Sequence, residues 1–308
     1  MIKDKIKNNI ILAPYTTFKI GGPAKYFVEV KTKEELQEAI AYSQAENLAW
    51  FILGGGSNLL VSDQGFDGLV IKLKNEDLID KGEQLIAGAG ARLSDLVALS
   101  EIKGLSGLEW ASGIPGSVGG AVRGNAGAYG QATGEALLEV EFFDTSDQQF
   151  KTLPASQLNF AYRHSLFKQD PSKIIWQAVF ALKPGDQELI SQSMAKILAE
   201  RLAKQPQLPS AGCVFKNLTA ADQLVEVLAA SEKIKGGKLA CALVVDNLGF
   251  KGQQNGGAEV SQEHANFIVN RQAATAKEVK ALIDKIKQAA EAKYQIKLEE
   301  EIQYLGLF

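Results

Sequence analysis

The sequence has few of the residues on which several classes of protein depend. It holds two cysteines, Cys213 and Cys241, so it can form one disulfide at most, which excludes the dense disulfide framework of a small secreted domain. Its longest apolar run, Leu239–Val245, is far shorter than the roughly 20 residues that a membrane-spanning helix needs. The two histidines and two cysteines lack the spacing of metal ligands, so we expect no metal site.

A strong charge of one sign and an apolar N-terminal segment are also missing. The net charge is −3, whereas general nucleic-acid-binding proteins are usually basic. The opening residues, MIKDKIKNNI, contain no apolar core of a signal peptide. We therefore expect a soluble cytoplasmic protein with no nucleic-acid or membrane partner.

What the sequence does contain is enough apolar material for a sizeable core. Hydrophobic residues make up 46% of the 308 residues, and a chain of this length usually forms two or three domains of about 100–200 residues each. Apolar periodicity and capping pairs predict alternating strands and helices. The predicted strands cover 26–30, 50–53, 69–71, 239–245 and 266–270, with a closing pair over 294–305; the predicted helices start after Thr32, Asp186 and Thr275, with another over 220–230.

Glycine is the unusual residue of this chain. There are 29 glycines, and ten of them fall between Gly104 and Gly134, which is too many for regular helix or strand throughout. Trp110, Ile114 and Tyr129 are interspersed, so the segment is not of low complexity. We expect an ordered loop system in which the backbone comes close to a ligand.

A second glycine run, Gly54-Gly55-Gly56, follows the predicted strand at 50–53. Such a run either forms a tight turn or brings backbone N–H groups onto a phosphate. Ser57 and Asn58 add side-chain donors directly after the glycines, which favours phosphate. The chain has no Walker loop, and its nearest match to the Rossmann pattern fails at Leu93. If the chain binds a phosphate, neither of these two common phosphate-binding motifs holds it.

Eight segments in order resemble one known family. They are TTFKIGGPA (16–24), GGGSNLL (54–60), GIPGSVGGA (113–121), NAGAYG (125–130), YRHSLFK (162–168), KQPQLPSAGCVFKN (204–217), GGAEVSQEHANFIVN (256–270) and LEEEIQYLG (298–306). In this order and spacing the chain resembles the UDP-N-acetylenolpyruvoylglucosamine reductase (MurB) family, over about residues 10–306. It is similar to the shorter subclass, because a long tyrosine-bearing insertion is absent.

The resemblance implies an α+β fold. The FAD-binding part would have the fold shared by p-cresol methylhydroxylase (PCMH) and vanillyl-alcohol oxidase, over about residues 21–185. The implied domains are FAD-binding subdomain 1 (1–75), to which the C-terminal strand (295–308) returns, FAD-binding subdomain 2 (76–205) and a smaller α+β substrate-binding domain (206–294).

The resemblance also implies a reaction and its cofactors. NADPH reduces a non-covalently bound FAD, and the flavin then passes hydride to the enolpyruvyl group of a UDP-sugar. Protonation of the neighbouring carbon yields UDP-N-acetylmuramate, a peptidoglycan precursor. We expect a monomer.

Three residues match the catalytic positions of the family. Arg163 suits a carboxylate, because its guanidinium presents a fork of donors where negative charge develops. Cys213 stands where the family has a serine proton donor, and a thiol, with a reference pKa of about 8.5, gives up a proton more readily than an alcohol. Glu301 matches the catalytic glutamate, with Glu299 as the alternative on the same face of a strand.

The remaining matched positions are implied binding residues. Tyr162, Lys204, Asn217 and His264 match positions that contact the substrate. The implied FAD-binding residues are Gly54, Gly55, Gly56, Ser57, Asn58, Gly113, Ile114, Gly116, Ser117, Gly119, Gly120, Asn125, Ala126 and Gly127.

Two other functions stay open on the sequence. One is another flavin oxidase of the same superfamily, although such oxidases often bind flavin covalently and His164, the only His or Cys in residues 1–185, lies in the YRHS motif. The other is a nucleotide-binding module without catalysis, which the retention of Arg163, Glu301 and Cys213 disfavours.

Overall fold

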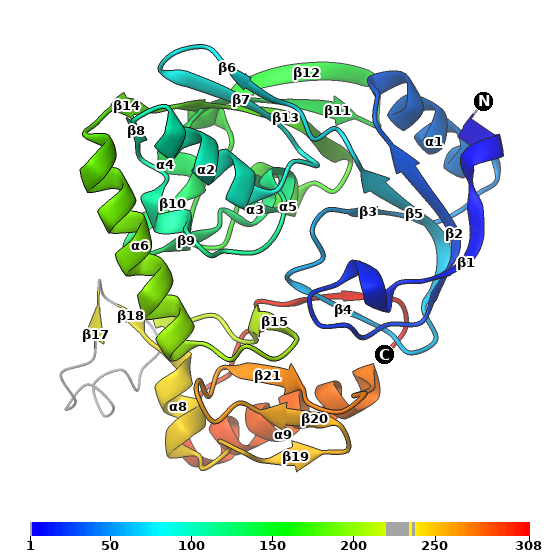
Figure 1. Ribbon diagram of the computed structural model, residues 1–308. Helices are drawn as coiled ribbons and strands as arrows, with labels where there is room; N and C mark the ends of the chain where they lie inside the picture. The colour runs from blue at the N-terminus through cyan, green and yellow to red at the C-terminus, as the bar shows by residue number, and fades with distance from the viewer. Residues whose placement is uncertain (1, 220–233, 236–237) are drawn as a thin grey trace. The chain divides into compact units, whose positions relative to one another are not determined.

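The computed structural model describes residues 2–219, 234–235 and 238–308 (Figure 1). The predicted helix over 220–230 lies outside the described residues. The chain divides into two compact units. Unit 1 comprises Met1–Ile10, Lys25–Gly55 and Asp67–Arg201, and unit 2 comprises Ile11–Ala24, Gly56–Phe66 and Leu202–Phe308. The three-part division of the sequence stays a prediction.

Unit 1 is built on two sheets and the helices that cover them. In the first sheet β3 runs parallel to β5, and in the second all neighbours are antiparallel. The first sheet has the order β1 (Lys7–Ile11), β2 (Pro23–Val30), β5 (Phe66–Leu73), β3 (Trp50–Leu53), and the second has the order β12 (Gln149–Pro154), β11 (Leu137–Asp144), β13 (Lys173–Ala181), β7 (Gln84–Gly88), β6 (Leu78–Asp80). The shorter pairs are β8 (Leu105–Ser106) with β14 (Lys183–Pro184) and β9 (Gly127–Ala128) with β10 (Gln131–Ala132).

The two helices of unit 1 that the sequence predicts, α1 and α6, begin where they are expected. Helix α1 starts after Thr32, whose hydroxyl accepts from the N–H of Glu35, and it buries Leu36, Ala39 and Ile40. Figure 1 shows α2 and α3 against one face of the five-stranded sheet. Helix α6 is capped by Asp186 as predicted and ends before Gln205. The helices are α1 (Lys33–Ala45), α2 (Leu93–Ile102), α3 (Val118–Gly124), α4 (Thr133–Ala136), α5 (Leu166–Gln169) and α6 (Gln187–Lys204), the last of which continues into unit 2.

Unit 2 has a small sheet backed by a long helix. Helix α9 contacts β19 and β20, and Thr275 and Glu278 form the predicted capping box at its start. The sheets are β15 (Ser210–Cys213), β21 (Phe267–Asn270), β20 (Ala258–Val260), β19 (Gln254–Asn255); β16 (Leu218–Thr219), β18 (Lys238–Leu239), β17 (Ile234–Lys235); and β22 (Gln303–Leu305) parallel to β4 (Leu59–Val61). The helices are α8 (Cys241–Asn247) and α9 (Ala276–Tyr294).

Two predicted elements of unit 2 are wrong. The apolar run 239–245, predicted as a strand, ends β18 and then forms helix α8. Its buried residues Cys241, Val244 and Val245 have helical spacing, and a short apolar run cannot distinguish a buried strand from a buried helix. The predicted strand pair over 294–305 is a single strand, β22, because α9 continues to Tyr294.

Candidate active site

The first glycine run lies directly against the second within unit 1. A side-chain carbon on Gly55 would lie 2.5 Å from the Cα of Gly116, and one on Gly54 would lie 2.5 Å from the hydroxyl oxygen of Ser117. A Cβ at Gly55 meets backbone atoms and does not fit without moving the neighbouring segment, whereas one at Gly54 meets the side chain of Ser117. The two glycine segments that were predicted from the sequence therefore meet, and they do so through backbone.

Three consecutive residues at this contact have backbone N–H groups that are available as donors. The N–H groups of Gly55, Gly56 and Ser57 find no acceptor among the residues that the structure describes. Nearby in unit 1, Lys72 donates to the carbonyl oxygen of Gly54 at 2.9 Å, and burial, followed by the charge of Lys74, lowers the pKa of the Lys72 ammonium. Consecutive N–H groups with a lysine at the same loop suit an anion such as the diphosphate of FAD.

The second glycine segment forms the start of α3 and uses its own donors. Ser117 caps the helix by accepting from the N–H of Gly120, while the N–H of Gly119 donates to the carbonyl oxygen of Ala89 at 2.9 Å. A Cβ on Gly119 would lie 2.8 Å from the Cβ of Ala89. Gly119 therefore provides close packing in this structure, and the N–H groups of Gly119 and Gly120 are already bonded. Gly113 and Ile114 lie before the helix, and Gly113 has a φ of +74°.

One buried hydroxyl beside this segment has no partner. The Oγ of Ser112 is buried and makes no hydrogen bond to any described residue. Buried polar groups are nearly always bonded, so this oxygen is suited to a polar ligand group. The described residues thus fit a bound FAD in two respects: the unbonded N–H groups of Gly55 in unit 1 and of Gly56 and Ser57 in unit 2, and the orphaned hydroxyl of Ser112 in unit 1.

Arg163 lies in a tight turn that the second glycine segment supports. The turn pairs Ala161 with His164, and Asn125 donates to the carbonyl oxygen of Ala161 at 2.9 Å. Arg163 has a φ of +55°, a conformation uncommon for residues other than glycine. Its guanidinium donates to the carbonyl oxygen of Gly127 at 3.2 Å.

The side chain of Arg163 is also held by its neighbour in sequence. The guanidinium lies over the ring of Tyr162, 5.3 Å from the ring centroid. Two contacts thus hold a half-buried guanidinium at the end of a strained turn. Such strain is concentrated at functional sites. The predicted residues Tyr162, Arg163, Asn125, Ala126 and Gly127 therefore lie in one region of unit 1.

In unit 2, Cys213 and Glu301 lie on neighbouring segments. The N–H of Glu301 donates to the carbonyl oxygen of Val214 at 2.7 Å, and Phe215 forms an antiparallel bridge with Glu300. Cys213 is the last residue of β15 and directly precedes Val214. Residues separated by almost 90 positions in the sequence thus meet through main-chain hydrogen bonds.

The three consecutive glutamates differ in their surroundings. The side chain of Glu299 is 71% exposed and forms an ion pair with Lys216. Glu300 accepts from the ammonium of Lys287 at 2.6 Å. Glu301 is half-buried, and the side-chain amide of Asn58 donates to its carbonyl oxygen at 3.0 Å. The carboxylates of Glu299 and Glu300 therefore serve ion pairs, and the predicted FAD residue Asn58 holds the backbone of the predicted catalytic Glu301.

The predicted substrate residues of unit 2 occupy different local settings. Asn217 accepts from the N–H of Cys241 at 3.2 Å, at the start of α8. His264 accepts at Nδ1 from the N–H of Asn266, and burial lowers the pKa of its imidazole. The ring is therefore neutral near pH 7 with its proton on Nε2, where it can donate to an oxygen. Lys204 is exposed at the end of α6.

The two cysteines are predicted to differ in reactivity. Both are free; Cys241 is fully buried, and burial raises the pKa of its thiol, whereas Cys213 is half-buried. In the native protein we expect iodoacetamide to modify Cys213 at least about tenfold faster than Cys241. Peptide mass spectrometry of briefly treated protein measures the two rates. Equal rates would contradict the assigned burial, and unfolded protein, in which both react, is the control.

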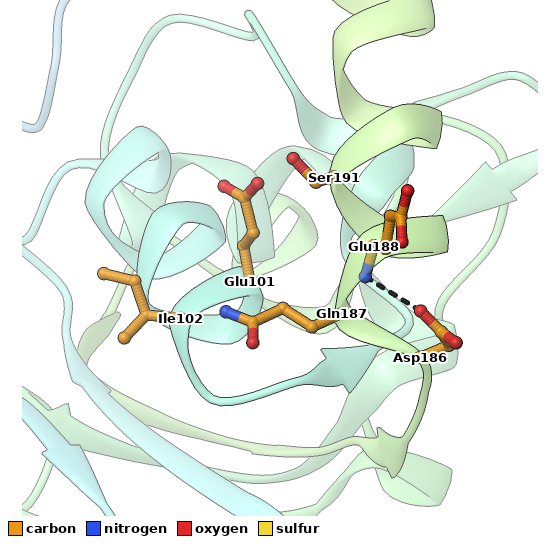
Figure 2. A pocket seen from close by; sticks show the side chains of 6 residues that line it. All are labelled: Glu101, Ile102, Asp186, Gln187, Glu188 and Ser191. Carbon is orange, nitrogen blue, oxygen red and sulfur yellow. Dashed lines mark hydrogen bonds between the residues drawn. The ribbon is translucent and has the colours of Figure 1, made fainter.

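A separate surface pocket does not contain the predicted residues. It has a volume of about 780 Å³ and is lined by Glu101, Ile102, Asp186, Gln187, Glu188 and Ser191 (Figure 2). Its carboxylates would repel an anionic nucleotide, and Figure 2 shows that Asp186 is occupied in capping the first turn of α6. This pocket gives no support to a nucleotide site.

The described part of the chain contains no cluster of His, Cys, Asp and Glu side chains suited to a metal ion. None of its helices is long and apolar enough to cross a membrane. The sequence prediction did not include Lys72, Ser112 or Asn266. Asn266 lies within the family segment at 256–270, so that segment could have indicated it. No sequence pattern distinguishes Lys72 or Ser112.

Comparisons with known proteins show the family to which the chain belongs. Residues 24–152 match the family model of the FAD binding domain, and residues 204–305 match that of the UDP-N-acetylenolpyruvoylglucosamine reductase C-terminal domain. The UDP-N-acetylenolpyruvoylglucosamine reductase of Solibacter usitatus is 39% identical over 298 residues, which cover 96% of this chain and 95% of the relative. That of Lactobacillus delbrueckii subsp. bulgaricus is 40% identical over 303 residues, with 98% and 95% covered.

A solved structure shows the same fold. The UDP-N-acetylenolpyruvylglucosamine reductase of Thermus caldophilus superposes with a TM-score of 0.80 at 34% identity, over 98% of this chain and 99% of that one. The predicted α+β fold with an FAD-binding part is thereby confirmed. On the identity and the length of these matches, the chain belongs to the family of UDP-N-acetylenolpyruvoylglucosamine reductases.

Proposed function

We propose that this chain reduces the enolpyruvyl group of UDP-N-acetylglucosamine-enolpyruvate to give UDP-N-acetylmuramate, with FAD as cofactor and NADPH as hydride donor. NADPH supplies the hydride by way of FAD, and one proton comes from a protein group, so the double bond gains one hydride and one proton. The observation that carries the proposal is the neighbouring placement of Cys213 and Glu301, within a chain that matches the family along its whole length.

The glycine loop after β3 is proposed to bind the diphosphate of FAD. Its consecutive N–H groups at Gly55, Gly56 and Ser57 are the donors, and the ammonium of Lys72 adds positive charge at the same loop. Bound FAD supplies hydride transfer between NADPH and the substrate. The chain's task is to hold the reacting groups in place and to exclude competing acceptors.

Arg163 is proposed to stabilise the substrate carboxylate as it becomes enolate-like. Hydride addition to the double bond pushes negative charge onto that carboxylate, and a guanidinium opposite it stabilises the transition state more than the ground state. The hydrogen bond to Gly127 and the stacking on Tyr162 support this role, because they hold the guanidinium before the charge develops.

Cys213 is proposed to deliver the proton that completes the reaction. Its thiol would protonate the carbon next to the carboxylate, and the resulting thiolate would regain a proton from solvent. Glu301 is the proposed second catalytic group of unit 2, and hydrogen bonds to Val214 and Asn58 hold its backbone. Lys204, Asn217, His264 and Tyr162 are the proposed substrate-binding residues.

The test begins with the colour of the purified, dialysed protein. We expect a two-banded flavin spectrum whose chromophore is released on denaturation, and NADPH oxidation that depends on the enolpyruvyl UDP-sugar. Flavin retained on the denatured chain would indicate a covalent oxidase. A protein that cannot be reconstituted with FAD, or that shows no substrate-dependent oxidation, would contradict the proposal.

We also propose that the enzyme is a monomer in the cytoplasm. The division into three domains that the sequence predicts, with boundaries near residues 75 and 205, is proposed as well. Sedimentation of the FAD-loaded protein measures the mass in solution, and a dimer would contradict the first of these statements.

A further inference from the structure

One buried side chain in unit 2 clasps the backbone that follows Cys213. Asn266 is 2% exposed. Its amide oxygen accepts from the N–H of Phe215 at 2.9 Å, and its amide nitrogen donates to the carbonyl oxygen of Phe215 at 2.8 Å. The main-chain carbonyl of Asn266 accepts from the N–H of Val214 at 2.7 Å. One residue thus satisfies both polar groups of Phe215 and one of Val214.

The same residue reaches the other candidate groups of unit 2. Val214, which it holds, accepts through its carbonyl from the N–H of Glu301. The N–H of Asn266 donates to Nδ1 of His264 at 3.3 Å and so selects the ring tautomer with its proton on Nε2. Asn266 is therefore connected to all three groups. It is hydrogen-bonded directly to His264, and it is connected through Val214 to Cys213 and Glu301.

The strand that carries Cys213 needs such support on its C-terminal side. The pairing of β15 with β21 shifts register between Ser210 and Cys213. Gly212, directly before the cysteine, has a φ of +79°, and no heavy atom lies within 4 Å of the place where its Cβ would be. The backbone before Cys213 is thus irregular, while the backbone after it is bonded at consecutive residues to Asn266.

We propose that Asn266 is a positioning residue for proton delivery: its amide clasp on Phe215, with its main-chain bond to Val214, sets the place of the Cys213 thiol. The inference rests on the proposed function of this site. Loss of the clasp displaces the thiol rather than removing it, and a misplacement of about 1 Å can slow a reaction about 100-fold. Steps that do not use Cys213 keep their rates.

The experiment compares half-reactions of the FAD-loaded enzyme in stopped flow without oxygen. In Asn266→Ala, flavin reduction by NADPH is expected to stay within about twofold of wild type, and reoxidation by substrate to slow about 10- to 100-fold. Asn266→Asp keeps the oxygen that accepts from the N–H of Phe215 and loses the donor. Its reoxidation rate is therefore expected to fall between those of wild type and Asn266→Ala. In the double variant with Cys213→Ala, reoxidation is no slower than with Cys213→Ala alone, because both changes remove the same step.

Asn270→Ala is the matched control, at the end of β21, the strand that begins directly after Asn266. Asn270 also makes side-chain bonds to backbone, at Phe18 and Ala274, and none to the Cys213 segment. It is expected to lower the melting temperature without changing the ratio of the two half-reactions. A second readout needs no turnover: iodoacetamide modifies Cys213 at a changed rate in Asn266→Ala and at the wild-type rate in Asn270→Ala.

Three results would overturn the positioning role. They are equal slowing of both half-reactions, a loss of melting temperature with no change in reoxidation or alkylation, and multiplicative slowing in the double variant. If Asn266→Ala does not fold, the same measurements on Asn266→Asp decide. Failure of the proposed function is distinguishable, because wild type would then show no substrate-dependent reoxidation, or Cys213→Ala would reoxidise normally.

Discussion

Cys213→Ala is expected to reduce its flavin with NADPH at the wild-type rate and to pass the hydride to the substrate about 100- to 10,000-fold more slowly, the usual contribution of a positioned general acid. The reason is that NADPH oxidation needs no proton from Cys213, whereas protonation of the substrate carbon does. Anaerobic stopped-flow measurement of flavin absorbance separates the two steps. The half-buried thiol at the end of β15, next to the segment bonded to Glu301, is the structural ground for this expectation.

Two further variants are the controls for this result. Cys213→Ser keeps a proton-bearing group of similar size and is expected to retain much of the activity. Cys241→Ala removes the other thiol, which is fully buried in unit 2, and is expected to leave both half-reactions unchanged. An unaffected second half-reaction in Cys213→Ala would remove Cys213 from the mechanism.

Gly55→Val is expected to abolish FAD binding rather than slow turnover alone. A Cβ at residue 55 would lie 2.5 Å from the Cα of Gly116 and 2.9 Å from the N of Ser117, and both are backbone atoms that cannot rotate away. The two glycine segments would have to separate, which displaces the N–H groups proposed to bind the diphosphate. We expect the purified variant to be colourless and its affinity for added FAD, measured by quenching of flavin fluorescence, to fall more than about 100-fold, since several charge-assisted hydrogen bonds are lost together.

Gly82→Val is the control for general destabilisation. Gly82 lies between β6 and β7 with a φ of +77°, and no heavy atom lies within 4 Å of its would-be Cβ. Valine there strains the backbone by about 1–2 kcal/mol but meets no neighbour, so the variant is expected to melt earlier and to keep its flavin. A Gly55→Val protein that retains full FAD would contradict the diphosphate assignment.

Local sequence signals predicted the helices that begin with a cap. Thr32 and Thr275 each accept from the residue three positions later, and Asp186 caps α6, because capping chemistry involves only neighbours along the chain. The run 239–245 was predicted as a strand and is largely helix α8, since its apolar residues are buried in either form. The choice between the two depended on what the rest of unit 2 packs against it.

The candidate site was likewise predictable from the sequence only in part. The glycines at 54–56 and 113–120 could be identified from their position after an apolar strand, but that Gly55 lies on Gly116 is known only from the structure. On the sequence, Glu301 matched the catalytic glutamate and Glu299 was the alternative on the same face of a strand. The structure pairs Glu299 with Lys216 and bonds the backbone of Glu301 to Val214 and Asn58, because the extended segment from 299 to 301 lies beside the segment after Cys213.

The sequence by itself determined the family, the cofactor class and the residue types that carry the chemistry, because these depend on ordered motifs and on side-chain identity. Only the tertiary structure decided which distant residues meet: Val214 with Glu301, Asn266 with Phe215, and Gly55 with Gly116. The physical reason is that hydrogen bonds and van der Waals contacts act over a few ångströms, whereas these partners are separated by about 50 to 90 residues of chain. Their proximity results from the burial of two cores, which no local pattern specifies.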